Sequence, residues 1–482
     1  MTKLAILLLC GALLPAQDAF RPVYHFRPAQ NWMNDPNGLI QWQGQYHLFY
    51  QYNPFGDVWG HMSWGHAVSR DLVHWRELPV AMQEENGVMI FSGSTVVDSA
   101  NTSGFCRGKD PCLVAIYTGH TPTRQHQNLA YSRYDGLTWT KYSGNPVIDL
   151  GMKDFRDPKV FWHPDQRRWI MVVALPREHK VRFFASSDLK QWKPIGDFGP
   201  AGATSGVWEC PDLFPLTIQG EGKQRWVLVV SINPGGPAGG SAVQYFIGDF
   251  DAMGFHAHDV GAPVLWADYG KDFYAATSFS GIPVKDGRRI WIGWFSNWQY
   301  ARDEPSAGWR TIQSVPRQLS LRRTSEGLRL VQRPISDVEA GPRNEFSIGG
   351  VTLAEANQRL SAFSSASFGV EAELSPGTGL LVRKGRNEET KIGIDAAGRP
   401  FVDRTRSGNV AFHKAFSGVH TAPINARGKL YVLVDRSSVE VFAAGGEAVI
   451  SDRIFPSPTS LGLALYGDST RRNHSVRVWQ IQ

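Results

Sequence analysis

The sequence feature that most constrains the fold is a repeated motif in which an aspartate is followed, four positions later, by a tryptophan. Its three copies occupy residues 71–75, 135–139 and 188–192. The copies lie 64 and 53 residues apart, and each follows a serine-containing segment that resembles the end of a strand. Three copies at similar intervals indicate a repeated supersecondary unit.

A second set of polar residues recurs at a similar interval. Its members are Asp35, Ser92, Asp157, Glu209 and Asp272, separated by 57, 65, 52 and 63 residues. Each opens a stretch that reads as strand, turn and strand, without a long amphipathic helical pattern. Such units suit four-stranded antiparallel blades, so residues 20–321 are predicted to form a five-bladed β-propeller. Side chains at the starts of the innermost strands would then converge on one channel.

The character of the sequence changes after the last of these units. Residues 322–345 are charged and irregular and are predicted to be a linker. Residues 346–482 contain short alternating stretches between turn signals, which is typical of a β-sandwich. Only residues 352–360 favour a helix, of one or two turns. The predicted fold class is therefore all-β, a propeller followed by a sandwich.

The amino-terminal residues predict export. Residues 1–19 contain one lysine followed by an apolar run that is too short to span a membrane. Such a segment is typical of a secretory signal peptide and predicts a secreted or periplasmic protein without a membrane span. In an exported protein Cys106 and Cys112, six positions apart, could be bridged, and two reduced thiols are the alternative. Cys210 is unpaired by count.

Charge and metal-ligand spacing exclude two classes of function. The formal net charge is +6 and the pI about 9.0, but the basic residues are dispersed along the chain. Nucleic-acid binding would need them clustered, so we expect an ordinary solvated surface. No Cys/His spacing resembles a zinc site, and His61 and His66 are expected to be hydrogen-bonded histidines. No metal and no cofactor are predicted.

Three carboxylic acids have settings that suit cleavage of a glycosidic bond. This reaction needs an ionised and a protonated carboxyl group on opposite sides of the anomeric carbon. Asp35 lies before a proline and an Asn-Gly turn, with the Asn34 amide and the Trp32 ring available to bind a sugar. Taken alone, Asp35 is better interpreted as a turn cap.

The neighbours of the other two acids suggest different roles. Arg156 adjoins Asp157 and is expected to keep it ionised, which suits hydrogen bonding to sugar hydroxyls; a surface ion pair is the alternative. Trp208 and Cys210 flank Glu209, and apolar neighbours favour the protonated form that a general acid needs. The alternative is an exposed glutamate at the start of a strand.

Further polar and aromatic residues fall near the same predicted rim. Aromatic rings can stack on the apolar face of a sugar, while amides, hydroxyls and charged groups bind its hydroxyls. The candidate substrate-binding residues are Asn34, Gln51, Trp59, Phe91, Ser92, Arg156, Asp272, Tyr274 and Trp298. Each could equally be structural, and their shared place in the repeat is the stronger argument.

The strings around these residues resemble glycoside hydrolase family 32, which contains invertases, inulinases and levanases. The matching strings are residues 32–38, 91–94, 155–160, 208–212, 269–275 and 296–300, with 435–442 in the carboxy-terminal part. The resemblance covers nearly the whole chain after the predicted signal. It implies a five-bladed propeller, a sandwich and retaining hydrolysis by double displacement, without a metal.

The resemblance also implies a role for each acid. Asp35 would attack C2 of a terminal fructosyl unit while Glu209 protonates the leaving oxygen. Glu209 would then deprotonate water, and Asp157 would hold ring hydroxyls. Fructans such as levan and inulin, and sucrose, are the expected substrates. Linkage preference and oligomeric state stay open.

The expectation of exo rather than endo action rests on a few positions. Endo-acting inulinases tend to carry glutamate where this chain has Asp35, which favours exo action. Residues 294–301 and 308–310 resemble bacterial exo-levanases and exo-inulinases, whereas Phe273 stands where asparagine is common and leaves chain-length preference open. The alternatives are a fructosyltransferase, a non-catalytic fructan-binding protein, and a propeller glycosidase acting on arabinan or xylan.

Overall fold

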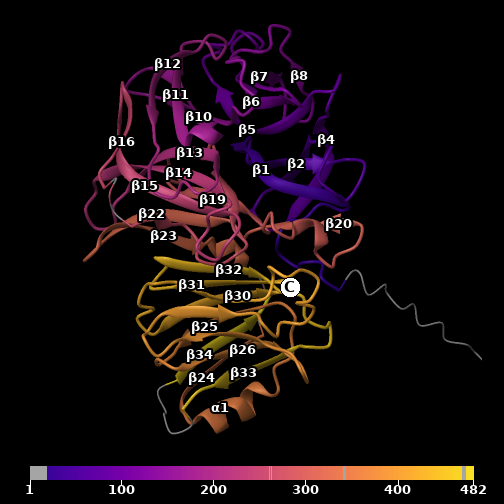
Figure 1. Ribbon diagram of the computed structural model, residues 1–482, viewed down its shortest axis with the longest axis vertical. Coiled ribbons are helices and arrows are strands. Elements are labelled where there is room, and N and C mark those ends of the chain that lie inside the picture. Colours follow the sequence, from indigo (N-terminus) through magenta and orange to yellow (C-terminus); the bar gives the residue numbers. More distant parts are fainter. Residues whose placement is uncertain (1–18, 260, 262, 340–343, 469–473, 482) are drawn as a thin grey trace, which may run out of the picture.

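The structure, a computed structural model, describes residues 19–259, 261, 263–339, 344–468 and 474–481 (Figure 1). All but the last residue of the predicted signal segment 1–19 lies outside these residues. Within the described residues, no helix is both long enough and apolar enough to cross a membrane.

In the described chain, five sheets follow one another between residues 31 and 334. The first contains β1 (Asn31–Trp42), β2 (Gln45–Asn53), β3 (Ser63–Ser69) and β4 (Trp75–Met82), with β20 (Trp309–Arg310) beside β1. The second contains β5 (Met89–Asp98), β6 (Cys112–Thr121), β7 (Arg124–Ser132) and β8 (Thr140–Lys141). The third contains β9 (Arg156–His163), β10 (Arg168–Leu175), β11 (Lys180–Ser186) and β12 (Lys193–Phe198).

The fourth and fifth sheets have one extra short strand each. The fourth contains β13 (Val207–Thr217), β14 (Gln224–Asn233), β15 (Ala242–Asp251) and β16 (Gly254–Ala257), with β17 (Leu265–Trp266) on β15. The fifth contains β18 (Tyr274–Ser278), β19 (Arg289–Phe295), β22 (Arg317–Thr324) and β23 (Gly327–Pro334), with β21 (Ile312–Gln313) on β19. Short 3₁₀ helices span Pro176–Glu178, Ala301–Asp303 and Ser336–Glu339.

The first strands of these sheets form a ring. β1 contacts β5, β5 contacts β9, β9 contacts β13, β13 contacts β18, and β18 returns to β1. This closure is the arrangement of a propeller, in which each sheet is a blade and its first strand faces the central channel. Residues far apart in the sequence therefore meet at the channel.

The Asp-x-x-x-Trp repeat forms the turn between the third and fourth strands of the first three blades. In the first blade, Ser69 Oγ donates to Asp71 Oδ1 (3.0 Å) and Trp75 Nε1 donates to the Leu72 carbonyl (3.0 Å). Leu72 has a φ of 67°, which a tight turn imposes. The same indole-to-carbonyl bond closes the turn at Trp139 (2.8 Å) and at Trp192 (2.8 Å). The repeat therefore marks the same turn geometry in three blades of this chain.

The remaining described strands form two sheets that enclose one apolar core, as predicted for a β-sandwich. The first contains, in order, β24 (Glu345–Val351), β34 (His474–Gln480), β25 (Phe368–Glu373), β30 (Lys429–Asp435), β31 (Ser438–Ala443) and β32 (Ala448–Arg453). The second contains β29 (Val419–Thr421), β28 (Pro400–Asp403), β27 (Thr390–Ile394), β26 (Thr378–Lys384) and β33 (Gly462–Tyr466). The expected helix is α1 (Leu353–Leu360), which begins at a Thr352–Glu355 capping box.

The expected linker differs from the structure. Part of residues 322–345 forms β23, which pairs with β22 and completes the fifth blade as far as Pro334. Leu321 and Leu330 are buried in the core of that blade, while Arg323 lies at the surface and pairs with Glu221. The arginines on the outer face hid the period-two pattern of these strands from sequence analysis.

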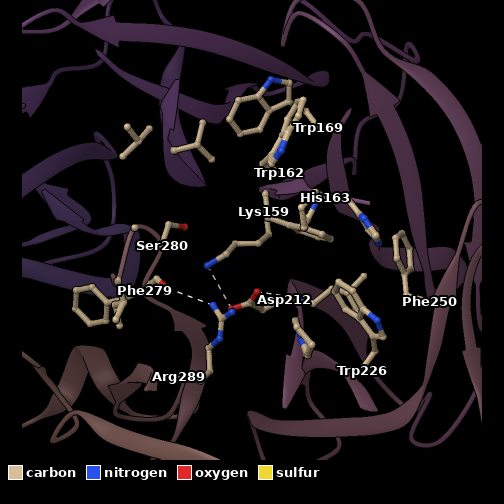
Figure 2. Close-up of a pocket in the computed structure, with 18 of the residues that line it drawn as sticks. Lys159, Trp162, His163, Trp169, Asp212, Trp226, Phe250, Phe279, Ser280 and Arg289 are labelled. Carbon is tan, nitrogen blue, oxygen red and sulfur yellow. Dashed lines mark hydrogen bonds and ion pairs between the residues drawn. The ribbon is translucent and has the colours of Figure 1, made fainter. Parts of the chain in front are cut away.

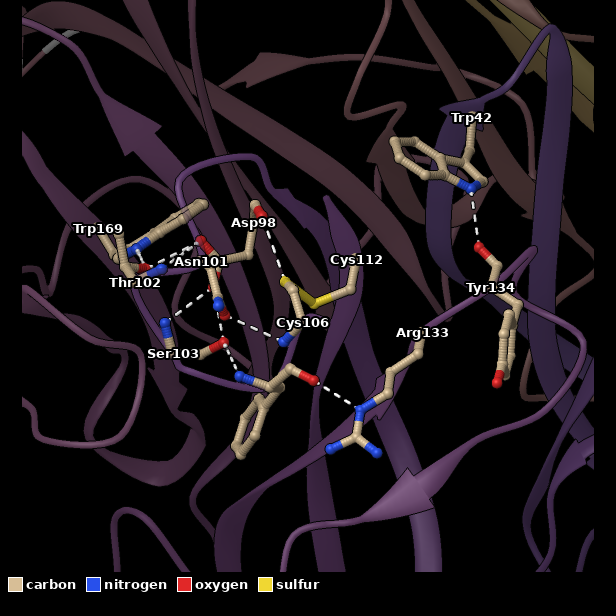
Figure 3. The surroundings of a disulfide bond; sticks show 11 residues. Trp42, Asp98, Asn101, Thr102, Ser103, Cys106, Cys112, Arg133, Tyr134 and Trp169 are labelled. Atoms are coloured by element: carbon tan, nitrogen blue, oxygen red, sulfur yellow. Dashed lines mark hydrogen bonds between the residues drawn. A yellow bond between two sulfur atoms is a disulfide. The ribbon is translucent and has the colours of Figure 1, made fainter. Parts of the chain in front are cut away.

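The possible cysteine bridge is present. Cys106 and Cys112 form a disulfide that closes the loop before β6 (Figure 3). Asn101 Oδ1 accepts a hydrogen bond from the Cys106 amide (3.0 Å), so the loop is held at the same end by both bonds. Cys210 is a buried free thiol.

Candidate active site

All five channel-facing strands are bulged at equivalent positions, β1 and β5 included. In β9, β13 and β18 the pairing register shifts immediately after Arg156, Glu209 and Tyr274. In each case the next residue has a positive φ, which is 67° at Asp157, 48° at Cys210 and 50° at Ala275. Because a bulge redirects side chains, it can turn them into the channel. Arg156, Glu209 and Tyr274 therefore correspond to one another in successive blades.

This correspondence brings the three side chains together. Arg156 Nε donates to Glu209 Oε1 (2.9 Å), and the Tyr274 hydroxyl donates to Glu209 Oε2. Asp154 Oδ1 accepts from Arg156 Nη1 (2.8 Å), and Gln125 Oε1 accepts from the same nitrogen (3.1 Å). The guanidinium is thus fixed on both sides and presents one edge to Glu209.

Of two expectations about neighbours, one holds in part and one was wrong. The charge of Arg156 lowers the pKa of Asp157 as expected, but its side chain donates to Glu209 and burial outweighs its charge. Trp208 is fully buried in the core of the blade, where its Nε1 donates to the Ala203 carbonyl (2.8 Å). Because successive side chains of a regular strand point to opposite faces, Trp208, on the regular side of the bulge, points into the core, whereas the bulge keeps Asp157 and Cys210 near the channel.

Asp35 is held by donors from two other blades as well as its own. Ser92 Oγ donates to Asp35 Oδ2 (2.7 Å), and Asn34 Nδ2 donates to Asp35 Oδ1 (3.0 Å). The Cys210 thiol lies 3.4 Å from Asp35 Oδ2. Burial raises the pKa of Asp35 above its ordinary value, and the bonds from Ser92 and Asn34 oppose that rise. The carboxylate is therefore oriented before any ligand binds.

Asp157 is the third acid of the cluster. The Cys210 amide donates to Asp157 Oδ2 (2.9 Å), and the Cys210 thiol lies 3.6 Å from the same oxygen. Burial raises the pKa of Asp157 to about 7; the positive charge of Arg156 opposes this, while Glu209 and Asp35 add to it. Three carboxyl groups from three blades thus influence one another in a nearly buried space.

Aromatic rings surround this cluster. Trp298 stacks on Trp32 with ring centroids 5.9 Å apart, and Trp59 meets the Phe91 ring edge-on at 6.0 Å. Trp59, Phe91 and Trp298 are partly exposed and pack against buried residues of the site, among them Cys210 and Tyr274. These rings are placed to contact the apolar face of a ligand.

Gln51 is placed close to the cluster but is engaged by the protein. It is 2% exposed, and its Nε2 donates to the Ile90 carbonyl (2.9 Å). A ligand would meet the neighbouring Ser92 and Asn34 more directly, because both contact Asp35.

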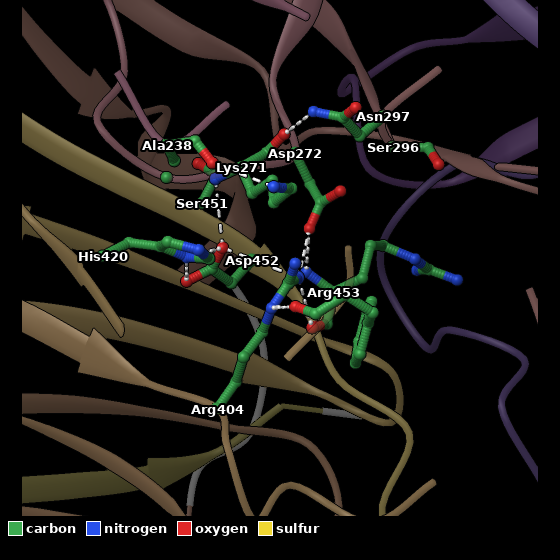
Figure 4. A network of polar contacts seen from close by, with 12 residues as sticks. Ala238, Lys271, Asp272, Ser296, Asn297, Arg404, His420, Ser451, Asp452 and Arg453 are labelled. Atoms are coloured by element: carbon green, nitrogen blue, oxygen red, sulfur yellow. Dashed lines mark hydrogen bonds and ion pairs between the residues drawn. The ribbon is translucent and has the colours of Figure 1, made fainter. Parts of the chain in front are cut away.

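Asp272 is not part of this site, which corrects the sequence prediction. Its fully buried carboxylate accepts from Arg404 Nη1 (2.6 Å) and from the Arg453 amide (2.8 Å), both in the sandwich (Figure 4). The position equivalent to Glu209 is Tyr274, two residues later. The other oxygen accepts from the Tyr300 hydroxyl, so the carboxylate is satisfied here and stabilises the contact between the two parts of the chain.

Sequence analysis missed the central place of Cys210, Gln125 and Asp154. Cys210 follows Glu209 as Asp157 follows Arg156, so aligning the repeats at Arg156 and Glu209 would have indicated it. Nothing in the local sequence marks Gln125. Among the described residues, no group of three or more His, Cys, Asp or Glu side chains could hold a metal ion. His61 and His66 are hydrogen-bonded to Glu84 and His47.

Comparisons with known proteins give consistent matches along the chain. The sequence model described as "Glycosyl hydrolases family 32 N-terminal domain" matches residues 25–334, and "Glycosyl hydrolases family 32 C terminal" matches residues 337–480. A levanase of Bacillus subtilis is 49% identical over 464 residues, covering 93% of this chain and 68% of the relative. An extracellular exo-inulinase of Aspergillus niger is 40% identical and covers 91% of this chain and 90% of the relative.

A solved structure has a similar fold. The β-fructofuranosidase of Schwanniomyces occidentalis, complexed with fructosyl-erythritol, superposes with a TM-score of 0.87 at 33% sequence identity. The match covers 96% of this chain and 98% of that one, so it includes both the propeller and the sandwich.

Proposed function

Because the chain belongs to glycosyl hydrolase family 32 and is a glycoside hydrolase, we propose that it is a retaining exo-β-fructosidase. It releases terminal β-D-fructofuranosyl units from fructans and from sucrose. The observation that carries this proposal is the convergence of Asp35, Asp157 and Glu209 from three blades on one buried site. The relatives named as levanase and exo-inulinase support the choice of sugar.

Asp35 is the nucleophile in this proposal. Ser92 and Asn34 hold its two oxygens in fixed directions, so the carboxylate needs little reorganisation to attack the anomeric carbon. Attack forms a fructosyl-enzyme ester as the bond to the leaving oxygen breaks. Asp157, fixed by the Cys210 amide, is placed to accept hydrogen bonds from ring hydroxyls.

Glu209 is the acid and then the base. It delivers a proton to the leaving oxygen in the first step and removes a proton from water in the second. Arg156 and Tyr274 hold its two oxygens, so the carboxyl group stays aimed at the same point in both steps. The aromatic rings of Trp59, Phe91 and Trp298 provide the surface on which the substrate rests.

Purified protein is expected to release fructose, and no larger sugar, from the ends of levan and inulin, and fructose and glucose from sucrose. Exo action leaves the remaining chain shortened by single units, so thin-layer or anion-exchange chromatography of early time points separates it from endo action. Failure to release fructose from all three substrates would refute the hydrolase proposal. Early accumulation of fructo-oligosaccharides would refute exo action.

The value of kcat/KM is expected to fall as the pH rises through about 7. Burial raises the pKa of Asp157 to about 7, so the cluster of acids loses one proton as the pH passes that value. Below that pH this proton can be passed on to the leaving oxygen, whereas above it the cluster has one proton fewer to give. Initial rates on sucrose between pH 4 and pH 9 test this. Activity that stays constant to pH 9 would contradict it, and full recovery on return to pH 5 excludes denaturation as the cause.

We also propose that the protein is exported. The predicted signal segment supports this, although residues 1–18 lie outside the described residues. The Cys106–Cys112 disulfide is typical of proteins in oxidising compartments. The Aspergillus niger relative is named as extracellular.

A further inference from the structure

A second cavity lies towards the end of the channel opposite the three carboxyl groups. Figure 2 shows residues that line it. It has a volume of about 550 Å³, within the range of sites for small ligands. Asp157 lies near the start of β9, whereas Trp162 of the cavity lies near its end. Five residues of extended strand place them about 16 Å apart. The aromatic side of this cavity is therefore separate from the proposed active site, and Lys159 lies between the two.

An aromatic wall forms one side of the cavity. Trp162 is 40% exposed, and its ring is held edge-on by Trp169 at 5.1 Å. Trp226 lines another side of the same cavity, supported by Phe250 at 5.2 Å and stacked with His163 at 5.7 Å. An exposed indole that is fixed from behind offers a rigid flat surface to a ligand.

The floor of the cavity is polar and balanced in charge. Lys159 Nζ lies 3.3 Å from Asp212 Oδ2, and both side chains are buried. Arg289 Nη1 makes long hydrogen bonds to Ser278 Oγ (3.5 Å) and the Phe279 carbonyl (3.4 Å). Arg288, which is paired with Asp286, and Asp165 also line the cavity. Counting Asp286, three cations lie near three carboxylates. A neutral ligand with many hydroxyl groups suits this mixture of donors and acceptors better than an anion does.

We propose that this cavity is a second, non-catalytic carbohydrate site that holds one or two hexose units of a fructan chain against Trp162. The choice of fructan rests on the proposed function. Binding here would keep a long chain on the enzyme between successive cleavages at the other end of the channel. Sucrose is too short to occupy both ends, so its hydrolysis does not depend on this site.

The test compares polymer binding with sucrose turnover in Trp162→Ala. Binding to levan is measured by affinity gel electrophoresis in a Glu209→Gln background, which slows turnover, with and without Trp162→Ala. Loss of one stacked ring is expected to weaken levan binding about tenfold. In the otherwise wild-type enzyme, Trp162→Ala should raise KM for levan and leave kcat/KM for sucrose unchanged. Trp162→Phe should restore most of the levan binding.

The matched control is Tyr134→Ala, which removes another exposed aromatic ring (56% exposed) on a different blade. It should bind levan as the parent does. Equal levan binding with and without Trp162→Ala, or an equal loss in Tyr134→Ala, would overturn the second site. These outcomes leave the proposed hydrolysis intact, whereas failure of the wild type to cleave sucrose and fructans would overturn the hydrolase proposal instead.

Discussion

Replacing Asp35 by asparagine is expected to reduce kcat on sucrose by about 10⁴-fold or more. Asparagine has the same shape, but its amide cannot form the ester with the fructosyl unit that retaining hydrolysis requires. The folded protein should be as stable as the parent, or more so, at pH 7. The folded-state pKa of Asp35 is raised by burial, so ionisation of this group opposes folding at neutral pH, and asparagine removes that cost.

Fructose release and a thermal melt together measure both parts of this prediction. Asp71→Asn is the matched control, because Asp71 lies in a surface turn of the same blade and touches none of the site residues. Its activity should equal that of the wild type. Residual activity of Asp35→Asn above about 1% of the wild type would show that another group is the nucleophile. A large fall in the melting temperature would show instead that Asp35 supports the fold.

Replacing Arg317 by methionine is expected to destabilise the protein by about 3–5 kcal/mol. Arg317 is fully buried in β22, where it donates to Glu440 of the sandwich (2.6 Å) and to Asp268 (3.1 Å). Ser451 Oγ also accepts from it (2.7 Å). Methionine fills much of the space, but Asp268 loses its cationic partner and Glu440 keeps only the His25 ring as an ion-pair partner.

Urea unfolding followed by fluorescence measures this effect. Arg323→Met on the same strand is the matched control, because Arg323 pairs with Glu221 at the exposed surface. No measurable change is expected there, since water replaces the lost ion pair. Equal midpoints for Arg317→Met and wild type would refute the role of Arg317 in joining the two parts of the chain.

Buried arginines stabilise the contact between the propeller and the sandwich, and they also hold Asp272 at that contact. Arg317, Arg404 and Arg453 are buried between the propeller and the sandwich, and their carboxylate partners include Glu440, Asp268 and Asp272. Asp272 has the spacing of the repeat, so the sequence placed it at the substrate-binding site. In the structure it lies instead between the propeller and the sandwich. Spacing predicts which blade a residue belongs to, but a difference of two positions decides whether it reaches the channel.

The sequence by itself determined the all-β fold, the succession of repeated units and the three acids on different units. Turns, period-two patterns and the family-like strings are contiguous, so they can be read without knowing which strands pair. The capping box before α1 and the possible Cys106–Cys112 bridge are also local features, and the structure contains both.

Only the tertiary structure decided which groups act on one another at the site. Arg156 contacts Glu209 across 53 positions, and the Cys210 thiol reaches Asp35 across 175. These contacts depend on bulges that shift the register and redirect successive side chains, and the bulges depend on pairing with a neighbouring strand. A sequence neighbour of a site residue can lie in the core, as Trp208 does, whereas most partners at the site come from another blade.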